Sequence, residues 1–368
     1  MTTEFQATFY FNTAIHLALD AGELPDALRL VQRWIAAEEE VGHVVHLANR
    51  QATEAHVQFE LGDHDLAERK AEEALETARA QRFGLYELLA LWTLAYFGLE
   101  RGTEAEARDA LAKAWRFGRE RGLFCTTLWR RGVIARLCAR ALAWDIEPTY
   151  AATLIRKHRL VAPAGLVRRD AWAWPLEVRT LGGLDIRLDG SKLGFGRKTP
   201  RRPLELLKLL VALGGRGVLT STICDTLWPE AEGDAAVRSF QTTLHRLRAM
   251  LDDPALLVLE DGKLSLDAGR CWIDIWELEQ LRGQPDVSDG ERLLELCRGA
   301  FLAGDESAWC LPVRERQHRR FVRAALGVGG RLEESGRWEQ ARQLYERCRE
   351  LAPSAALQEA AARCRLAY

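Results

Sequence analysis

The sequence of 368 residues has few of the features that mark a membrane protein or a metalloprotein. Its eight cysteines are scattered and form no Cys-x-x-Cys pair, which argues against a zinc knuckle or a disulfide framework and favours reduced, buried thiols. It has no apolar run of about 18 residues, so we expect no membrane span. Its amino-terminal stretch has no basic n-region, unlike a signal peptide. We therefore expect a cytoplasmic protein without a membrane partner.

Common catalytic motifs are absent as well. The sequence contains no G-x-x-x-x-G-K-[S/T] phosphate loop, no G-x-S-x-G nucleophile elbow and no H-E-x-x-H zinc motif. We therefore expect no catalysis, no cofactor and no metal site. An enzyme that carries its repeats as an accessory is the least favoured interpretation, and a nucleotide-hydrolysis assay would test it.

The overall charge is close to neutral. The formal net charge is −2, and 28% of the residues are charged, as in ordinary globular proteins. Any surface for nucleic acid must therefore be a local basic patch. The length allows two or three domains, each with its own core.

Residues 1–163 contain an internal repeat of about forty residues. Gly22, Gly62 and Gly102 keep this interval, and an alanine follows each of them five positions later. The glycine suits a tight turn between two helices, and the small alanine lets the paired helices approach closely. A fixed period without strand patterning predicts a helical solenoid. The pattern resembles tetratricopeptide-like repeats in the longer form found in the sensor regions of MalT-like regulators.

Such solenoids present concave surfaces to proteins, peptides or small ligands, so we expect an unidentified protein or small-molecule ligand here. A plain spacer is the alternative. His43, His46 and His56 have no acidic partner at metal-ligand spacing, and we expect them on solvated helix faces. Residues 128–160 form a degenerate fourth unit that suits a cap.

The helical period ends at a segment that contains Pro163 and Pro175, which places a domain boundary at about 162–174. Apolar and polar residues then alternate over 176–195, which predicts short antiparallel strands. We expect the next domain over 175–282.

Helices and a hairpin follow in this domain. Residues 198–213 read as a helix with Pro203 in its first turn. A second helix is expected over 222–228, capped by Thr220 or Ser221. The strands 256–259 and 263–266 flank an Asp-Gly turn, and 271–274 suit a third strand. This order of strands, three helices and hairpin is that of a winged helix-turn-helix.

The third helix, Gly233–Leu251, is the centre of this interpretation, with Asp234 as its expected cap. It has two opposed stripes. One is apolar: Ala236, Phe240, Leu244, Leu247 and Leu251. The other holds Arg238, Gln241, His245 and Arg248, with Thr242 beside it. Such side chains can meet base edges or phosphates in the major groove, although most amphipathic helices bind no DNA.

Charge supports the same surface. From 195 to 250 there are nine basic and five acidic residues, a net charge of +4. Phosphate should therefore be drawn here with salt-sensitive affinity. We expect Arg238, Gln241, Thr242 and His245 at base edges, and Arg246 and Arg248 on phosphates or bases. Solvated surface side chains are the alternative for each.

This domain resembles the DNA-binding domain of OmpR-type response regulators and of the Streptomyces antibiotic regulatory proteins. The resemblance rests on the R-x-x-x-L-L-x-L-L pattern from Arg202, the helix that ends at Trp228, and L-H-R-L-R-A-M-L over 244–251. An Asp-Ile-Trp at 274–276 also fits. The match spans about 176–282.

Residues 289–368 repeat the solenoid offsets after Gly336, with Trp338, Ala341, Tyr345 and Cys348. This module resembles the bacterial transcriptional activator domain of the same antibiotic regulatory family. The sequence ends at residue 368, where that domain usually continues, so we expect a shortened or incomplete version. The fold class expected overall is mainly α: a helical-repeat solenoid, a winged helix with small sheets, and a second helical module.

These resemblances imply a bacterial, cytoplasmic transcription regulator, most simply an activator, that binds double-stranded DNA. They imply that Lys263 on the wing approaches the minor groove or a phosphate. They also imply that the loop with Glu230 and Glu232 faces RNA polymerase. The ATPase module that precedes the repeats in MalT-like regulators is absent from this sequence. The competing interpretation is a protein-interaction scaffold in which the winged helix and the repeats bind proteins instead of DNA.

Overall fold

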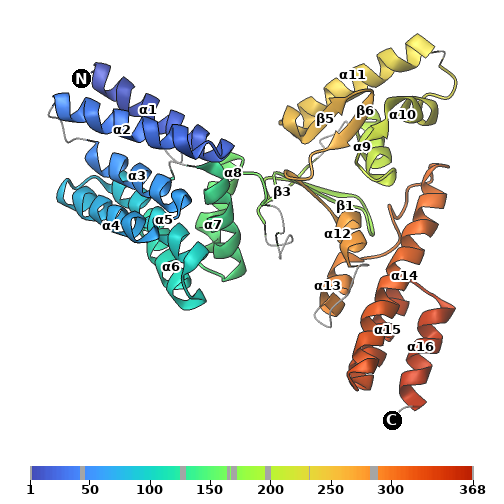
Figure 1. The fold of residues 1–368 in the computed structure, drawn as a ribbon. Coiled ribbons are helices and arrows are strands. Elements are labelled where there is room, and N and C mark those ends of the chain that lie inside the picture. Colours follow the sequence, from blue (N-terminus) through green and yellow to red (C-terminus); the bar gives the residue numbers. More distant parts are fainter. Residues whose placement is uncertain are drawn as a thin grey trace. The chain divides into compact units, whose positions relative to one another are not determined.

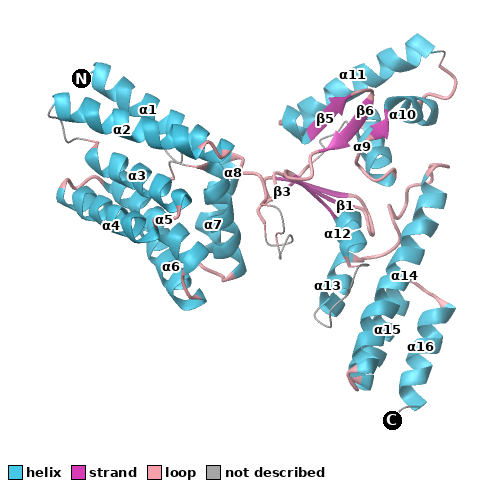
Figure 2. Ribbon diagram, viewed as in Figure 1, coloured by secondary structure: helices cyan, strands magenta, loops and turns pink. Residues whose placement is uncertain are grey.

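The computed structural model describes residues 2–41, 46–124, 130–163, 166, 172–194, 200–231, 233–281 and 289–366. Over this range the chain is mainly helical with two small sheets (Figures 1 and 2). It divides into two compact units, Met1–Ala173 and Trp174–Tyr368. Within the described residues, no helix is long and apolar enough to cross a membrane.

The first unit is a series of helices that pair antiparallel with their neighbours along the chain. Gly22 and Gly62 end the first helix of their pairs with φ of 76° and 91°, as a tight turn requires. Gly102 has an ordinary φ of −76°. Glycine is required there by lack of space, because a Cβ would lie 2.7 Å from the Gly98 carbonyl oxygen. The helices are α1 (Thr2–Ala21), α2 (Leu24–Val41), α3 (Leu47–Leu61), α4 (His64–Ala80), α5 (Gly84–Arg101), α6 (Glu104–Arg121), α7 (Arg131–Ala143) and α8 (Pro148–His158).

Small residues at the repeat offsets form the core of this unit. Ala27, Ala67 and Ala107 are at most 2% exposed, and the Cα of Ala107 lies close to Gly98 of the preceding helix. The paired helices therefore approach closely at each repeat, as the alanine pattern predicted. The degenerate fourth unit is also a helix pair, α7 and α8.

The second unit begins with a four-stranded sheet of order β3-β2-β1-β7. β1 (Leu176–Arg179), β2 (Asp185–Leu188) and β3 (Ser191–Lys192) are antiparallel, as the alternation predicted. β7 (Cys271–Ile273) joins β1 in parallel instead of extending the hairpin that precedes it. Asp274, directly after β7, explains this pairing, since its buried carboxylate accepts hydrogen bonds from the backbone N–H groups of Thr180 and Leu181.

Three helices and a second sheet follow. α9 (Arg201–Ala212), α10 (Thr220–Leu227) and α11 (Gly233–Leu251) pack together. The sheet has the order β4-β6-β5, from β4 (Val218–Leu219), β6 (Lys263–Leu266) and β5 (Leu257–Glu260), with the short helix η2 (Pro254–Leu256) before β5.

The structure corrects three details of this region. α10 starts at Thr220, so Thr220 and Ser221 lie inside it, and the preceding residue Leu219 makes no side-chain cap. Asp234 lies within the first turn of α11 instead of ahead of the helix. Val218 and Leu219 pair with β6 as a strand, which the sequence analysis did not predict.

The remaining helices belong to the same compact unit: α12 (Asp274–Gln280), α13 (Asp289–Leu296), α14 (Cys310–Glu334), α15 (Trp338–Leu351) and α16 (Ala355–Leu366). Residues 175–282 and 289–368, expected as separate domains, are joined by polar contacts. Lys208 on α9 forms a 2.7 Å ion pair with Asp305, and Arg316 on α14 donates to the Ala212 carbonyl. Gly336 has φ of 73° between α14 and α15, and Ala341, Tyr345 and Cys348 are buried, following the repeat offsets.

Candidate nucleic-acid interface

α11 has the bounds and the buried face that its sequence predicted. Its apolar stripe is at most 6% exposed at each of five positions: Ala236, Phe240, Leu244, Leu247 and Leu251. The stripe packs against α9 and α10. Burial of this face fixes the rotation of the helix about its axis, so the opposite face is held toward solvent.

Five of the predicted contact residues lie together on that exposed face: Arg238, Gln241, Thr242, His245 and Arg246. Thr242 donates its hydroxyl to the Arg238 carbonyl at 2.9 Å. The other four side chains make no hydrogen bond or ion pair with any residue that the structure describes. They are therefore available to a ligand, and Arg238 and Arg246 give the face a positive charge.

Arg248 differs from its neighbours on the same stripe. Its side chain is half-buried, and its guanidinium donates to the Leu257 carbonyl at 3.0 Å. This bond ties the end of α11 to the start of β5. In this structure Arg248 anchors the helix to the hairpin and does not extend the exposed face.

Lys263 lies where the sequence analysis placed it, at the start of the second hairpin strand. It is exposed and pairs in register with Glu260 across the turn. Asp261 and Gly262 form the turn with φ of 48° and 70°, the conformation that favours Asp-Gly in tight hairpins. β4 adds a third strand on the other side of β6, which stiffens the hairpin.

Several cations of the predicted basic patch have partners. Arg202 pairs with Glu205 at 2.9 Å, Lys208 pairs with Asp305, and Arg216 lies over the Trp276 ring at 4.2 Å. Arg197 and Lys198 are outside the described residues. Arg201, at the start of α9, is exposed and forms no ion pair with the described part of the chain. Fewer cations are therefore available to bind phosphate than the nine basic residues counted in the sequence from 195 to 250.

An apolar groove lies beside the exposed face, and the sequence analysis missed it. It encloses about 410 Å³ between α10, the start of α11 and the hairpin turn, and Gln241 of the exposed face forms part of its lining. Val237 and Leu259, 47% and 40% exposed, line it, and Asp225 and Asp261 are acids in the same lining. Glu230, exposed, is in the loop before α11, and Glu232 falls outside the described residues. This side of the unit is acidic and apolar, in contrast to the cationic side chains of α11.

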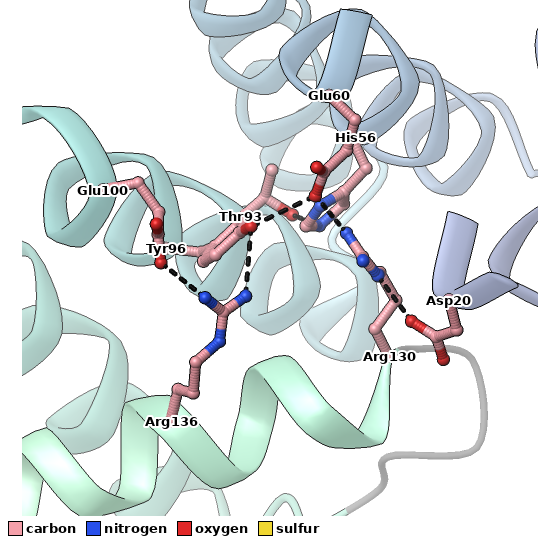
Figure 3. A network of polar contacts seen from close by, with 8 residues as sticks. All are labelled: Asp20, His56, Glu60, Thr93, Tyr96, Glu100, Arg130 and Arg136. Carbon is pink, nitrogen blue, oxygen red and sulfur yellow. Dashed lines mark hydrogen bonds and ion pairs between the residues drawn. The ribbon is translucent and has the colours of Figure 1, made fainter. Parts of the chain in front are cut away.

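The first unit holds a polar network of its own, with Arg130 and His56 among its buried members (Figure 3). Arg130, 8% exposed, forms ion pairs with Asp20 of α1 and Glu60 of α3. Tyr96 donates to the same Glu60 carboxylate at 3.1 Å and accepts a hydrogen bond from Arg136 at 3.2 Å. Side chains from four helix pairs thus meet on the inner helices α1, α3, α5 and α7.

Two histidines of this unit correct the expectation of solvated faces. His56 is fully buried and lies 3.2 Å from the Thr93 hydroxyl, and His46 is half-buried against Tyr86. His43 falls outside the described residues. Burial, with Arg130 nearby, lowers the pKa of His56 well below its usual value. His56 lies on a face of α3 that packing against α1 and α5 covers, which a single helix does not reveal, whereas His46 directly precedes α3.

No group of histidine, cysteine, aspartate and glutamate side chains in the described ranges is arranged to hold a metal ion. Comparison of the sequence with models of known protein families and with curated protein sequences found no match. The case for a function therefore rests on the geometry of these two units.

Proposed function

We propose that the chain is a sequence-specific DNA-binding transcription regulator, and that its second unit contains a winged helix-turn-helix. The observation that carries the proposal is α11, which buries one stripe and presents Arg238, Gln241, His245 and Arg246 without partners on the other. A helix of this width fits the major groove of DNA. In this proposal α10 and α11 form the helix-turn-helix and β5–β6 form the wing.

The side chains suit the two kinds of contact that such a helix makes. Arg238 and Gln241 would read guanine and adenine, because their planar groups can bond two atoms of those bases. Thr242 has a methyl group, which suits a thymine methyl. Arg246, Arg201 and Lys263 would hold phosphates, which positions the helix without reading sequence.

DNA binding is best tested by selecting bound fragments from a random duplex library and measuring affinity by mobility shift. We expect the double variant R238A/Q241A to bind the selected sequence at least about 30-fold more weakly, since each of its two base contacts is worth about 1–3 kcal/mol. The variant should lose less affinity for unrelated DNA, because the phosphate contacts remain.

The matched control is R349A, which removes an exposed arginine from α15, outside the proposed interface. It should leave the selected affinity unchanged. Unchanged binding by R238A/Q241A, or failure of the intact chain to bind any duplex at low salt, would reject the proposal. Circular dichroism of each variant must show the helicity of the starting protein.

We further propose that the acidic loop and groove beside α11 contact RNA polymerase, so that the regulator acts as an activator. Glu230 is exposed in the loop, and its neighbour in the chain, Ala231, lines the groove together with the exposed Val237 and Leu259. A basic, partly apolar segment of polymerase would complement this surface. The variant E230K should keep its DNA affinity and activate transcription less in a purified system. Full activation by E230K would oppose this part of the proposal.

A protein-interaction scaffold is the second candidate, and the exposed apolar groove is the observation that favours it. In that case α11 and the tetratricopeptide-like repeats would bind proteins, and low-salt binding to genomic fragments would be absent. The unpaired arginines on α11 favour DNA, because an apolar protein surface would offer no partner for their charges.

A further inference from the structure

The C-terminal half of the second unit contains an apolar cavity that the proposed DNA contacts do not use. It encloses about 400 Å³ between the segment before α14, the first turns of α14 and the turn that joins α15 to α16. Its apolar lining includes Leu181, Phe301, Phe321, Leu351, Ala352 and Pro353. This volume lies in the range of cavities that hold small organic ligands.

The cavity also has cationic side chains. Arg319 and His318 line it from α14, and neither forms an ion pair or hydrogen bond with the described residues. Arg314 lines it too, but its guanidinium already donates to the carbonyls of Phe301, Leu302 and Asp305. Glu315 is the one acid among the lining residues.

Arg314 therefore has a different role from Arg319. Its hydrogen bonds fix the chain of residues 301–305 against α14 and so hold the cavity wall in place. Arg319 is exposed and keeps its full capacity to bond a carboxylate or sulfonate, and guanidinium pairs such planar anions well.

We propose that this cavity binds a small molecule with a flat apolar body and a single carboxylate or sulfonate. Ala300, Leu351 and Pro353, the apolar lining residues that are not buried, would contact the body, and Arg319 would pair with the anion at the rim. A neutral apolar molecule would leave the free guanidinium unused, and a strongly polar one would lose its hydration against the apolar wall.

The cavity wall is joined to the proposed DNA-binding domain by a backbone bridge and by hydrogen bonds of two side chains. Leu181 forms an antiparallel bridge with Phe301, and its N–H donates to Asp274 at the start of α12. Arg316, beside the cavity, donates to the Ala212 carbonyl at the end of α9. A ligand that shifts α14 would therefore bias the position of α9, on which α11 packs. This regulatory consequence rests on the proposed function, whereas binding of the ligand does not.

Binding is tested on the full chain with two matched probes, 1-naphthoate and its uncharged analogue 1-naphthamide, by isothermal titration calorimetry. We expect one naphthoate per chain and at least 5-fold weaker binding of the amide. The variant R319Q should bring the naphthoate affinity down to that of the amide. The control R323Q changes an exposed arginine one turn further along α14 that is outside the cavity lining, and it should bind like the starting protein.

A second variant fills the space without touching a charge. Ala300 lines the cavity and is exposed, so A300W should cover it and abolish binding, whereas A303W in the same segment, outside the lining, should not. Equal affinity for the two probes, or unchanged binding by both R319Q and A300W, would overturn the proposal. The effect of naphthoate on DNA affinity is measured in a separate experiment. Failure of the DNA-binding proposal therefore does not affect the ligand-binding test.

Discussion

The guanidinium of Arg130 donates to the Asp20 carboxylate at 2.9 Å, although 110 residues separate them in the chain. The same guanidinium pairs with Glu60, so one side chain at the start of the fourth helix pair contacts the first and second pairs. Most of the packing in this unit joins helices of the same pair or of neighbouring pairs. Arg130 therefore adds a long-range link to this unit.

Replacing Arg130 by methionine should destabilise α1 and α3 together. The variant keeps an apolar stem but leaves Glu60, 28% exposed, without its cationic partner. Charged hydrogen bonds are worth about 1.5–3 kcal/mol each, so we expect a loss of roughly 2 kcal/mol in local stability. Hydrogen-exchange mass spectrometry of peptides from 2–21 and 47–61 measures it in the full chain.

The matched control for this change is R101M. Arg101 pairs with Glu68 outside this network, and both side chains are well exposed, at 39% and 50%, so the pair should contribute less than about 1 kcal/mol. Equal exchange in R130M and in the starting protein would show that the Arg130 link carries no stability.

Acid should destabilise the first unit through its buried histidines. Burial, with a smaller effect from Arg130, lowers the pKa of His16 to about 3 in the folded state, and an unfolded histidine titrates near 6.5. Between these values the unfolded chain binds the additional proton, so stability falls as pH falls. From pH 7.5 to 5.5 the loss is about 1.4 kcal/mol for His16, and His56, whose pKa is also lowered, adds a loss in the same direction.

The variants H16Q and H56Q test this assignment, because glutamine does not titrate. Hydrogen exchange of peptides from α1 and α3 is measured at both pH values over a range of urea concentrations and corrected for intrinsic exchange rates. Between the two pH values, the urea midpoint of each helix should change less in each variant than in the starting protein. The same pH dependence in all three proteins would mean that other groups are responsible.

Local patterns in the sequence predicted the elements of both units well. The apolar stripe of α11 and the Asp-Gly turn after β5 depend on residues within one helix or one hairpin, and both lie where they were expected. The forty-residue interval likewise predicted the helix pairs, since each glycine and alanine acts within its own pair.

Features that depend on which helix and strand faces pack against each other could not be predicted from the sequence. His56 reads as a surface residue of one helix, yet stacking of α1 and α5 on α3 buries it. Arg248 belongs to the polar stripe by periodicity, but β5 comes close enough for its carbonyl to accept the guanidinium. The parallel pairing of β7 with β1 depends on Asp274. Its carboxylate also accepts a hydrogen bond from the hydroxyl of Thr180, which is 94 residues away in the chain.

Two adjacent glycines in α14 should respond in opposite directions to alanine. A Cβ at Gly329 would lie 2.2 Å from the ring of Tyr345, whereas a Cβ at Gly330 would meet nothing within 4 Å. G329A should therefore cost about 1–3 kcal/mol through overpacking, and G330A should gain up to about 1 kcal/mol because alanine favours the helix. Hydrogen exchange of peptides from 310–351 gives both values. A similar effect of the two changes would mean that Tyr345 can move aside without cost.

Arg246 and Arg248 offer the sharpest separation of binding from stability in α11. Arg246 is exposed without a partner, and Arg248 donates to the Leu257 carbonyl. R246M should leave the stability of α11 and β5 unchanged and weaken DNA binding at every sequence, with a smaller dependence on salt, as expected for loss of one phosphate contact. R248M should instead lower local stability by about 1–3 kcal/mol, because a buried carbonyl loses its donor. Mobility shifts at several salt concentrations, combined with exchange in peptides from 233–260, distinguish the two. If R248M weakens DNA binding without faster exchange, Arg248 contacts DNA as the sequence first suggested, and its bond to Leu257 is not what holds the helix end.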